Sequence, residues 1–138
     1  MADQVQFELV APEQLLISDA VEMVVVPGAE GDFGVLPGHA PFISTVRTGV
    51  ISVYENGAVS RRVFVSGGFA EVMPERCTVL ADEAISLDNA DRAAVESRLH
   101  AAEAAASDAG DGNASPSMMT ELAVSRALLD AIDQAARG

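Results

Sequence analysis

A run dense in glycine and proline, residues 27–41, most constrains what this chain can fold into. Its sequence is PGAEGDFGVLPGHAP, which holds four glycines and three prolines in fifteen residues. This composition excludes a helix and predicts two tight loops around a short extended piece at residues 32–36. Apolar runs flank it at residues 21–26 and 42–46, so we expect the loops to lie at one end of a β structure, where binding residues are common. The polar side chains that the loops present are those of Glu30, Asp32 and His39.

An alternation of apolar and polar residues extends over most of the first 82 residues, starting with Val5, Phe7 and Leu9. Period two is typical of half-buried strands. Asn56-Gly57 predicts a type I′ turn that pairs the strands on either side of it, and Ser66-Gly67-Gly68 is expected to be another turn. About eight to ten short strands without a helix-length crossover predict an all-β antiparallel sandwich or flattened barrel.

The periodicity changes near residue 87, where a helical hairpin is expected to begin. Asp88 is the predicted N-cap of a first helix at residues 89–106, with Ala94 and Leu99 on its apolar side. Gly110, Gly112 and Pro116 predict a linker at residues 107–115. Ser115-Pro116 then opens a second helix at residues 116–136. The predicted apolar stripe of that helix is Met118, Leu122, Ala123, Leu129 and Ile132. The sequence thus predicts two domains, a sandwich at residues 1–86 and a two-helix antiparallel hairpin at residues 87–138.

The charge balance narrows the choice of partners. The chain has 138 residues and a formal net charge of −13, which argues against binding nucleic acid or docking on anionic lipid. No apolar run approaches the roughly 20 residues of a membrane span, so direct insertion into lipid is not expected. A basic protein surface is the expected partner. Cys77, the single cysteine, alternates with Val79 and is predicted to be a small buried apolar residue.

Motifs of catalysis and cofactor binding are missing from the sequence. It contains neither a glycine-rich phosphate loop nor a nucleophile elbow. His39 has no second histidine, cysteine or acid at the spacing of a metal site. We therefore expect no catalytic residues, no metal and no cofactor.

Three segments carry a resemblance to a known family. The run EGDFGVLPGHAP at residues 30–41 resembles the signature of the epsilon subunit of the bacterial F-type ATP synthase, called delta in mitochondria. SGGFAEV at residues 66–72 and TVLADEA at residues 78–84 are similar to two further segments of that family, in the same order and spacing. An alanine-rich helical tail follows, as in bacterial members.

The resemblance implies a non-catalytic rotor subunit of the central stalk, at the cytoplasmic face of the bacterial inner membrane. Such a subunit couples proton-driven rotation of the c-ring to ATP synthesis. It implies that the loop with Glu30, Asp32 and His39 contacts the c-ring and that a broad apolar face is covered by the gamma subunit. The candidate gamma contacts are Leu36, Phe42, Gly68 and Phe69.

The resemblance also implies that the hairpin contacts the alpha and beta subunits and regulates ATP hydrolysis. That action depends on basic residues, and the tail has four arginines among nine acids. The expected inhibition is therefore weak.

A remnant of a nucleotide motif lies at the start of the first predicted helix. Some bacterial epsilon subunits bind ATP through [I/L]-D-x-x-R-A, whereas here one extra residue separates Asp88 from Arg92 in LDNADRA. The same two residues fit an N-cap and a salt bridge within the helix. Two alternatives to a stalk subunit are a nucleotide sensor and a free-standing sandwich module with a dimerising helical tail.

Overall fold

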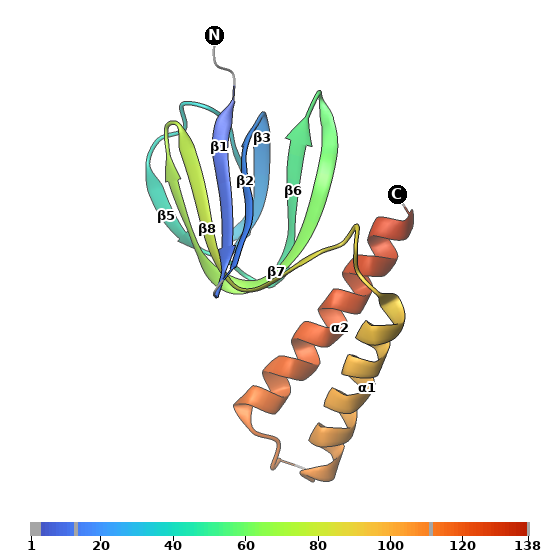
Figure 1. Ribbon diagram of the computed structural model, residues 1–138. Helices are drawn as coiled ribbons and strands as arrows, with labels where there is room; N and C mark the ends of the chain where they lie inside the picture. Colours follow the sequence, from blue (N-terminus) through green and yellow to red (C-terminus); the bar gives the residue numbers. More distant parts are fainter. Residues whose placement is uncertain (1–3, 13, 111, 138) are drawn as a thin grey trace. The chain divides into compact units, whose positions relative to one another are not determined.

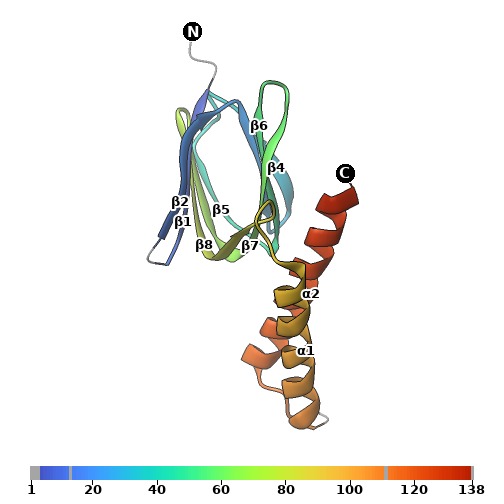
Figure 2. The same ribbon diagram turned by 45° about the vertical axis from the view of Figure 1, so that its right-hand side comes forward.

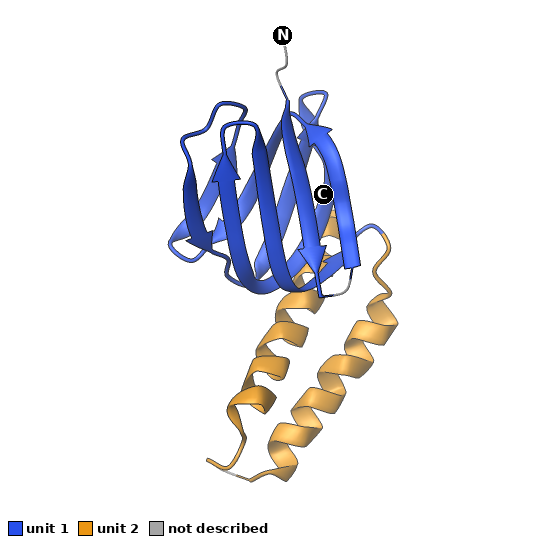
Figure 3. Ribbon diagram, turned by 60° about the vertical axis from the view of Figure 1, so that its left-hand side comes forward, with its two compact units in different colours: residues 1–88 blue, residues 89–138 orange. Residues whose placement is uncertain are grey.

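The computed structural model describes residues 4–12, 14–110 and 112–137 and forms two compact units, residues 1–88 and 89–138 (Figure 3). The predicted linker includes Asp111, which lies outside the described residues. Each unit is built from one type of secondary structure, strands in the first and helices in the second. Within the described ranges, neither helix is long and apolar enough to cross a membrane.

The first unit consists of eight strands (Figure 1). In chain order they are β1 (Val5–Ala11), β2 (Gln14–Val21), β3 (Met23–Gly28), β4 (Gly31–Val35), β5 (Phe42–Thr45), β6 (Gly49–Glu55), β7 (Ala58–Met73) and β8 (Arg76–Ser86). They hydrogen-bond in the order β2-β1-β8-β7-β6-β3-β4, and β5 pairs separately with β7. Figure 2 shows these strands in two facing layers.

The predicted fold class, an antiparallel sandwich followed by a helical hairpin, is confirmed. One pairing departs from the antiparallel rule, because β1 runs parallel to β8. β1 is the first and β8 the last strand of the sandwich, so the connection between these two parallel strands consists of β2 to β7. Periodicity within a strand does not reveal a pairing over this distance.

The long strand β7 joins the two layers of the sandwich. Its first half pairs with β6 and its second half with β5, while β8 follows it along most of its length. The change of partner falls at Ser66-Gly67-Gly68, where the two glycines have φ of 69° and 111°. The predicted turn at these residues is therefore wrong: the positive φ angles bend a continuous strand and do not end it.

Alternate residues of both layers form the core. Residues from seven strands, all but β5, are fully or almost fully buried, among them Phe7, Leu9, Val24, Ile51 and Val79. The β6–β7 hairpin turns at Asn56-Gly57, with φ of 56° and 77°, and Glu55 pairs with Ala58. This predicted turn is confirmed. Cys77 is also buried, as predicted, and burial raises the pKa of its thiol to about 12.

The second unit contains α1 (Arg92–Asp108) and α2 (Pro116–Arg137). The N-cap of α1 is Asp91, whose carboxylate accepts a hydrogen bond from the Ala94 amide at 3.2 Å. The predicted cap, Asp88, is wrong because the chain is still tied to the sheet there: the Leu87 amide donates to the Arg62 carbonyl at 3.0 Å. The helix can begin only after the turn that follows.

The second helix begins as predicted. The Ser115 hydroxyl accepts a hydrogen bond from the Met118 amide at 3.2 Å, and Pro116 is the first helical residue. Its predicted stripe is wrong, because the buried residues of α2 are Val124, Ser125 and Leu128. In α1 they are Val95, Leu99 and Ala102, whereas Ala94 is exposed. Apolar residues surround α2 on several sides, so its periodicity does not select one face.

Candidate docking surfaces

The acidic tip is the turn between β3 and β4. Gly28 pairs with Gly31, which leaves Ala29 and Glu30 at the turn, and both are exposed. The Asp32 carboxylate accepts a hydrogen bond from Arg47 Nη2 at 2.6 Å, and Nη1 of the same guanidinium donates to the Gly28 carbonyl at 2.5 Å. Asp32 thus helps to hold the turn in shape, and Glu30 presents its charge at the end of it.

His39 lies in the loop at the other end of β4, where the Gly38 amide donates to the Pro74 carbonyl at 2.6 Å, whereas the Ala29 amide of the acidic tip donates to the Thr45 carbonyl at the far end of β5. Aromatic rings extend from His39 toward the middle of β4. The His39 ring centroid lies 5.2 Å from that of Phe42, which in turn meets Phe33 edge to face at 5.1 Å. Phe33 directly follows Asp32 in β4. The structure therefore holds Glu30 and Asp32 together at the β3–β4 turn and places His39 at the opposite end of β4. A hollow of about 500 Å³ lies between the turn and β5, lined by residues 29–33 and 42–45.

A row of apolar side chains crosses the outer face of four strands. Phe69 of β7 pairs with Leu80 of β8, Leu80 with Val10 of β1, and Val10 with Leu15 of β2. Residues paired in register project from the same face of a sheet. Phe69 is 59% exposed, Leu80 52% and Leu15 61%. We call Leu15, Val10, Leu80 and Phe69 the apolar strip.

Other exposed apolar residues lie in β5, at the end of β7 and in the loop after β4. Ile43 of β5 is 71% exposed and Met73 of β7 39% exposed, and Glu71 separates them as the register partner of Ile43. Leu36, in the loop after β4, is 54% exposed. Exposed apolar side chains gathered on one face of a sheet are a candidate interaction surface.

The predicted gamma contacts divide into two kinds in this structure. Leu36 and Phe69 are exposed and available to a partner. Phe42 is half-buried and packs against the core. A Cβ atom on Gly68 would collide with the Leu80 carbonyl oxygen, so Gly68 is needed for the close approach of β7 to β8.

Sequence reasoning missed three members of the apolar strip, Val10, Leu15 and Leu80. A usable pattern was present. Leu80 stands between Val79 and Ala81 in a strand, and successive side chains of a strand point to opposite faces. If Val79 and Ala81 point into the core, Leu80 must point outward.

The motif remnant at the start of α1 is engaged within the hairpin. Arg92 donates to Asp133 of α2 through Nε at 2.8 Å and Nη2 at 3.1 Å, and its Nη1 lies 2.9 Å from Glu96. The hydrogen bonds to Asp133 raise the pKa of Arg92 and lower the pKa of Asp133. Arg92 is therefore paired with these two acids, and Asp88 lies in the turn before the helix. In the described part of the chain, no group of three or more His, Cys, Asp or Glu residues could hold a metal ion.

Comparisons with known proteins agree with this architecture. Residues 4–87 match the family described as ATP synthase, Delta/Epsilon chain, beta-sandwich domain. The ATP synthase epsilon chain of Rhodospirillum rubrum is 52% identical over 138 residues, which are 100% of both chains. That of Rhodospirillum centenum is 53% identical over 137 residues, covering 96% of this chain and 94% of the relative.

Two solved structures share the fold. The first is a chain of the Euglena gracilis mitochondrial ATP synthase, OSCP/F1/c-ring, with a TM-score of 0.73 and 20% identity over 97% of this chain and 82% of that chain. The second is a chain of the Tetrahymena thermophila mitochondrial ATP synthase central stalk/c-ring, with a TM-score of 0.54 and 11% identity over 95% of each chain.

A β-sandwich followed by a helical hairpin is the fold that this chain shares with chains of solved ATP synthases. The chain belongs to the ATP synthase delta/epsilon family, and the relatives that it matches over its full length are epsilon chains. An epsilon chain is a non-catalytic subunit of the synthase.

Proposed function

We propose that this chain is a rotor subunit of the central stalk of an F-type ATP synthase, coupling proton-driven c-ring rotation to ATP synthesis. Family membership supports the assignment, and the titles of the two structural neighbours name F1/c-ring and central stalk/c-ring assemblies. The observation that carries the mechanical role is the apolar strip, which crosses four hydrogen-bonded strands. The chain then works at the cytoplasmic face of the bacterial inner membrane as a peripheral part of the complex.

The apolar strip is the proposed contact with the gamma subunit. A stable interface buries more than about 1,000 Å² in total, which one loop cannot provide. The strip offers side chains from β2, β1, β8 and β7, and Leu36, Ile43 and Met73 widen it. Its strands belong to one hydrogen-bonded sheet, so a sideways load on one side chain is shared by the backbone hydrogen bonds of its neighbours. A rotor part needs this stiffness to transmit torque.

The acidic tip is the proposed contact with the polar loops of the c-ring. Glu30 supplies an exposed negative charge, and the bonds from Arg47 to Asp32 and to the Gly28 carbonyl fix the turn that carries it. His39 lies at the opposite end of β4, so the proposed contact is limited to the turn with Glu30 and Asp32. A preformed turn loses less conformational entropy on docking than a mobile loop does.

The hairpin is the proposed regulatory part, in contact with the alpha and beta subunits. Arg92, Arg98 and Arg126 are each engaged by an acid of the hairpin itself. Inhibition that depends on basic residues meeting an acidic catalytic subunit must first break these pairs, so we expect it to be weak. Removing the hairpin from a rebuilt complex is then expected to raise ATP hydrolysis less than about twofold.

Co-purification from a membrane extract tests the proposed function. A stalk subunit is expected to be monomeric when purified alone and to retain gamma when captured from the extract. A free-standing module would instead form a stable oligomer and leave gamma unbound. The nucleotide-sensor alternative predicts saturable ATP binding by the isolated chain, and we expect none because Asp133 and Glu96 engage Arg92.

A further inference from the structure

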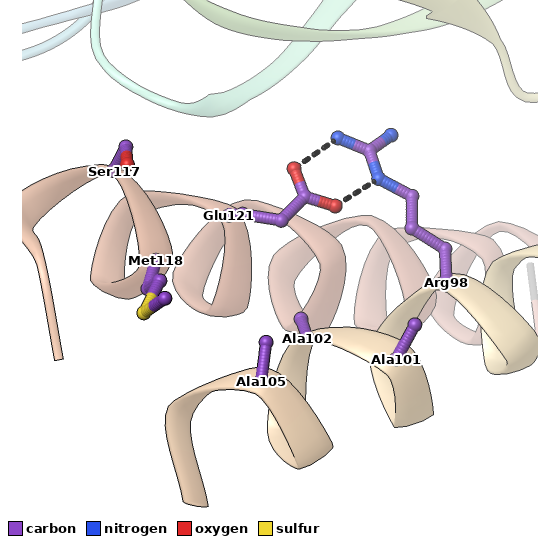
Figure 4. A pocket seen from close by; sticks show the side chains of 7 residues that line it. All are labelled: Arg98, Ala101, Ala102, Ala105, Ser117, Met118 and Glu121. Atoms are coloured by element: carbon purple, nitrogen blue, oxygen red, sulfur yellow. Dashed lines mark hydrogen bonds and ion pairs between the residues drawn. The ribbon is translucent and has the colours of Figure 1, made fainter. Parts of the chain in front are cut away.

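One carboxylate of the sandwich is engaged by a backbone amide and not by an arginine. In the hairpin, by comparison, Arg98 donates to Glu121 through Nε at 2.7 Å and Nη2 at 2.9 Å, beside a hollow of about 330 Å³ (Figure 4). Glu22 differs, because its Oε1 accepts a hydrogen bond from the Gly57 amide at 2.9 Å. The two residues are 35 positions apart in the chain, so only the fold brings this carboxylate to the turn between β6 and β7.

The backbone holds Glu22 beside this turn. Its amide donates to the Tyr54 carbonyl at 3.0 Å, and the next residue, Met23, is the register partner of Tyr54. The β6–β7 hairpin, green in Figure 1, is thereby tied to the start of β3. Glu22 is half-buried, whereas Asn56 and Gly57 are exposed. The turn is therefore open to water and yet restrained by one side chain from outside the hairpin.

The two residues of this turn can react with each other. The backbone nitrogen that follows an asparagine can attack the carbonyl carbon of the asparagine side chain, and glycine hinders the attack least because it has no Cβ. Around Gly57 there is open space, and Asn56 and Gly57 have φ of 56° and 77°. Among the residues that the structure describes, none hydrogen-bonds the Asn56 carboxamide. The other two asparagines, Asn89 and Asn113, both precede alanine, so this chemistry is favoured at Asn56.

The reaction needs only this turn and water. A base in the solvent removes the proton of the Gly57 amide, and the nitrogen forms a bond to Cγ of Asn56. The bond from Cγ to Nδ2 then breaks, and Nδ2 leaves as ammonia with a proton taken from water. Water adds to either carbonyl of the resulting cyclic imide, the succinimide. The product is aspartate or isoaspartate at position 56, and no oxidant or reductant takes part.

We propose that Asn56 is a site of self-modification through a succinimide, and that the Glu22 carboxylate restrains the reaction. The negative charge of Glu22 opposes the formation of an amide anion at Gly57, because the amide proton is bound in a charge-assisted hydrogen bond. The same bond fixes the peptide plane, which has to turn for the nitrogen to reach Cγ. The site is a property of the isolated chain and does not depend on the proposed stalk function.

The two products differ in their effect on the β6–β7 hairpin. Asp-Gly suits a type I′ turn as Asn-Gly does, so the aspartate product retains the hairpin and adds a negative charge near Glu22. Isoaspartate carries the side-chain methylene in the main chain. The extra atom disturbs the register that pairs Glu55 with Ala58. We therefore expect the isoaspartate product, and not Asn56→Asp, to unfold at a lower urea concentration than the parent.

Incubation of the full-length chain at neutral pH, followed by cleavage after arginine and mass spectrometry, tests this site. Residues 48–61 form one peptide, and Asn56 is its single asparagine. Glu22→Ala is expected to speed the loss of ammonia from Asn56 about threefold to tenfold, the effect of one partly exposed hydrogen bond. Glu22→Gln keeps an acceptor without the charge and is expected to fall between the parent and Glu22→Ala. Asn113, which is exposed but precedes alanine, is expected to react more slowly than Asn56 of Glu22→Ala.

Two controls separate the restraint from other effects. Asp19→Ala removes a carboxylate that bonds Arg61 of the same hairpin at 2.9 Å and is expected to leave the rate at Asn56 unchanged. In urea that unfolds the chain, the parent and Glu22→Ala are expected to react equally, because the bond to Gly57 is then absent in both.

Two results would overturn the proposal. Equal rates in the folded parent and folded Glu22→Ala, or an equal acceleration by Asp19→Ala, would show that Glu22 does not restrain the reaction. Folded Glu22→Ala whose Asn56 stays intact while the urea-unfolded chain reacts would show that the turn is not a modification site.

Discussion

Truncation of Phe69 tests the apolar strip quantitatively. Phe69 is 59% exposed in the free chain, and fully burying a phenylalanine side chain contributes about 1.5–3 kcal/mol. Covering the exposed part with gamma is therefore worth about 1–2 kcal/mol, and each 1.4 kcal/mol is about tenfold in affinity. We predict that Phe69→Ala weakens gamma binding about fourfold to twentyfold and that Leu80→Ala acts in the same direction.

The assay is a binding titration of the full-length chain against purified gamma, and the structure supplies a matched control. Met119 of α2 is 52% exposed, like Leu80, so Met119→Ala removes a similar amount of exposed apolar surface outside the strip and is expected to leave the affinity unchanged. Tyr54, the single tyrosine in a chain without tryptophan, lies in β6, and its fluorescence monitors whether the sandwich is folded. Folded Phe69→Ala and Leu80→Ala proteins that bind gamma as tightly as the parent would refute the assignment of the strip.

Three further predictions concern stability and titration. Gly68→Ala forces a methyl group against the β8 backbone at a φ of 111° and is expected to lower the free energy of unfolding by at least about 2 kcal/mol. Gly57→Ala, at a φ of 77° with open space around it, is expected to cost about 1 kcal/mol, and equal losses in urea titrations would contradict the assigned close approach. The buried Cys77 thiol, with its pKa raised to about 12, is expected to react with a disulfide reagent at pH 8 about a thousandfold more slowly than an exposed thiol; rapid labelling of the native chain would show that it is accessible. The hydrogen bond from Arg98 lowers the pKa of Glu121, so its stabilisation of the hairpin is complete at neutral pH and is lost as the pH falls below the ordinary glutamate value of about 4.3. Carbon NMR titration should find that Arg98→Gln raises the Glu121 pKa toward that value, and an unchanged pKa would contradict this origin.

Local backbone requirements explain which elements the sequence predicts well. Asn56-Gly57 needs positive φ at both positions, a demand that depends on no distant residue, and the hairpin forms there. Ser115-Pro116 likewise caps and opens α2 by local chemistry. Alternation also finds the inward residues of most strands, because one face of each strand is buried.

Features that depend on distant partners are the ones that the sequence hides. The sequence shows two adjacent glycines at residues 67 and 68, which fit a turn or a bend equally well. Only the close approach of β8 shows that they bend a continuous strand. Asp88 and Asp91 are equally good caps in local terms, and the bond from the Leu87 amide to the Arg62 carbonyl decides between them. The parallel pairing of β1 with β8 depends in the same way on residues far apart in the chain.

In the candidate site, too, the part formed by one short run was predictable from the sequence and the part formed by several strands was not. The acidic tip is visible in the sequence because glycine, proline and acids cluster within one short run. The apolar strip is assembled from four strands, and its members become neighbours only through strand register. Asp32 appears in the sequence as a free acid, and only the fold brings Arg47 beside it.

The central claim is that the sandwich alone holds the gamma subunit and the hairpin is an accessory. Its core residues all lie between Val5 and Ala84, so a chain ending at Asp88 retains the whole core. The most direct measurement is the affinity of that shortened chain for gamma, compared with the full-length chain. We predict dissociation constants within about threefold of each other, because the apolar strip lies entirely in the sandwich. Loss of binding by a shortened chain whose Tyr54 fluorescence shows a folded sandwich would contradict the account.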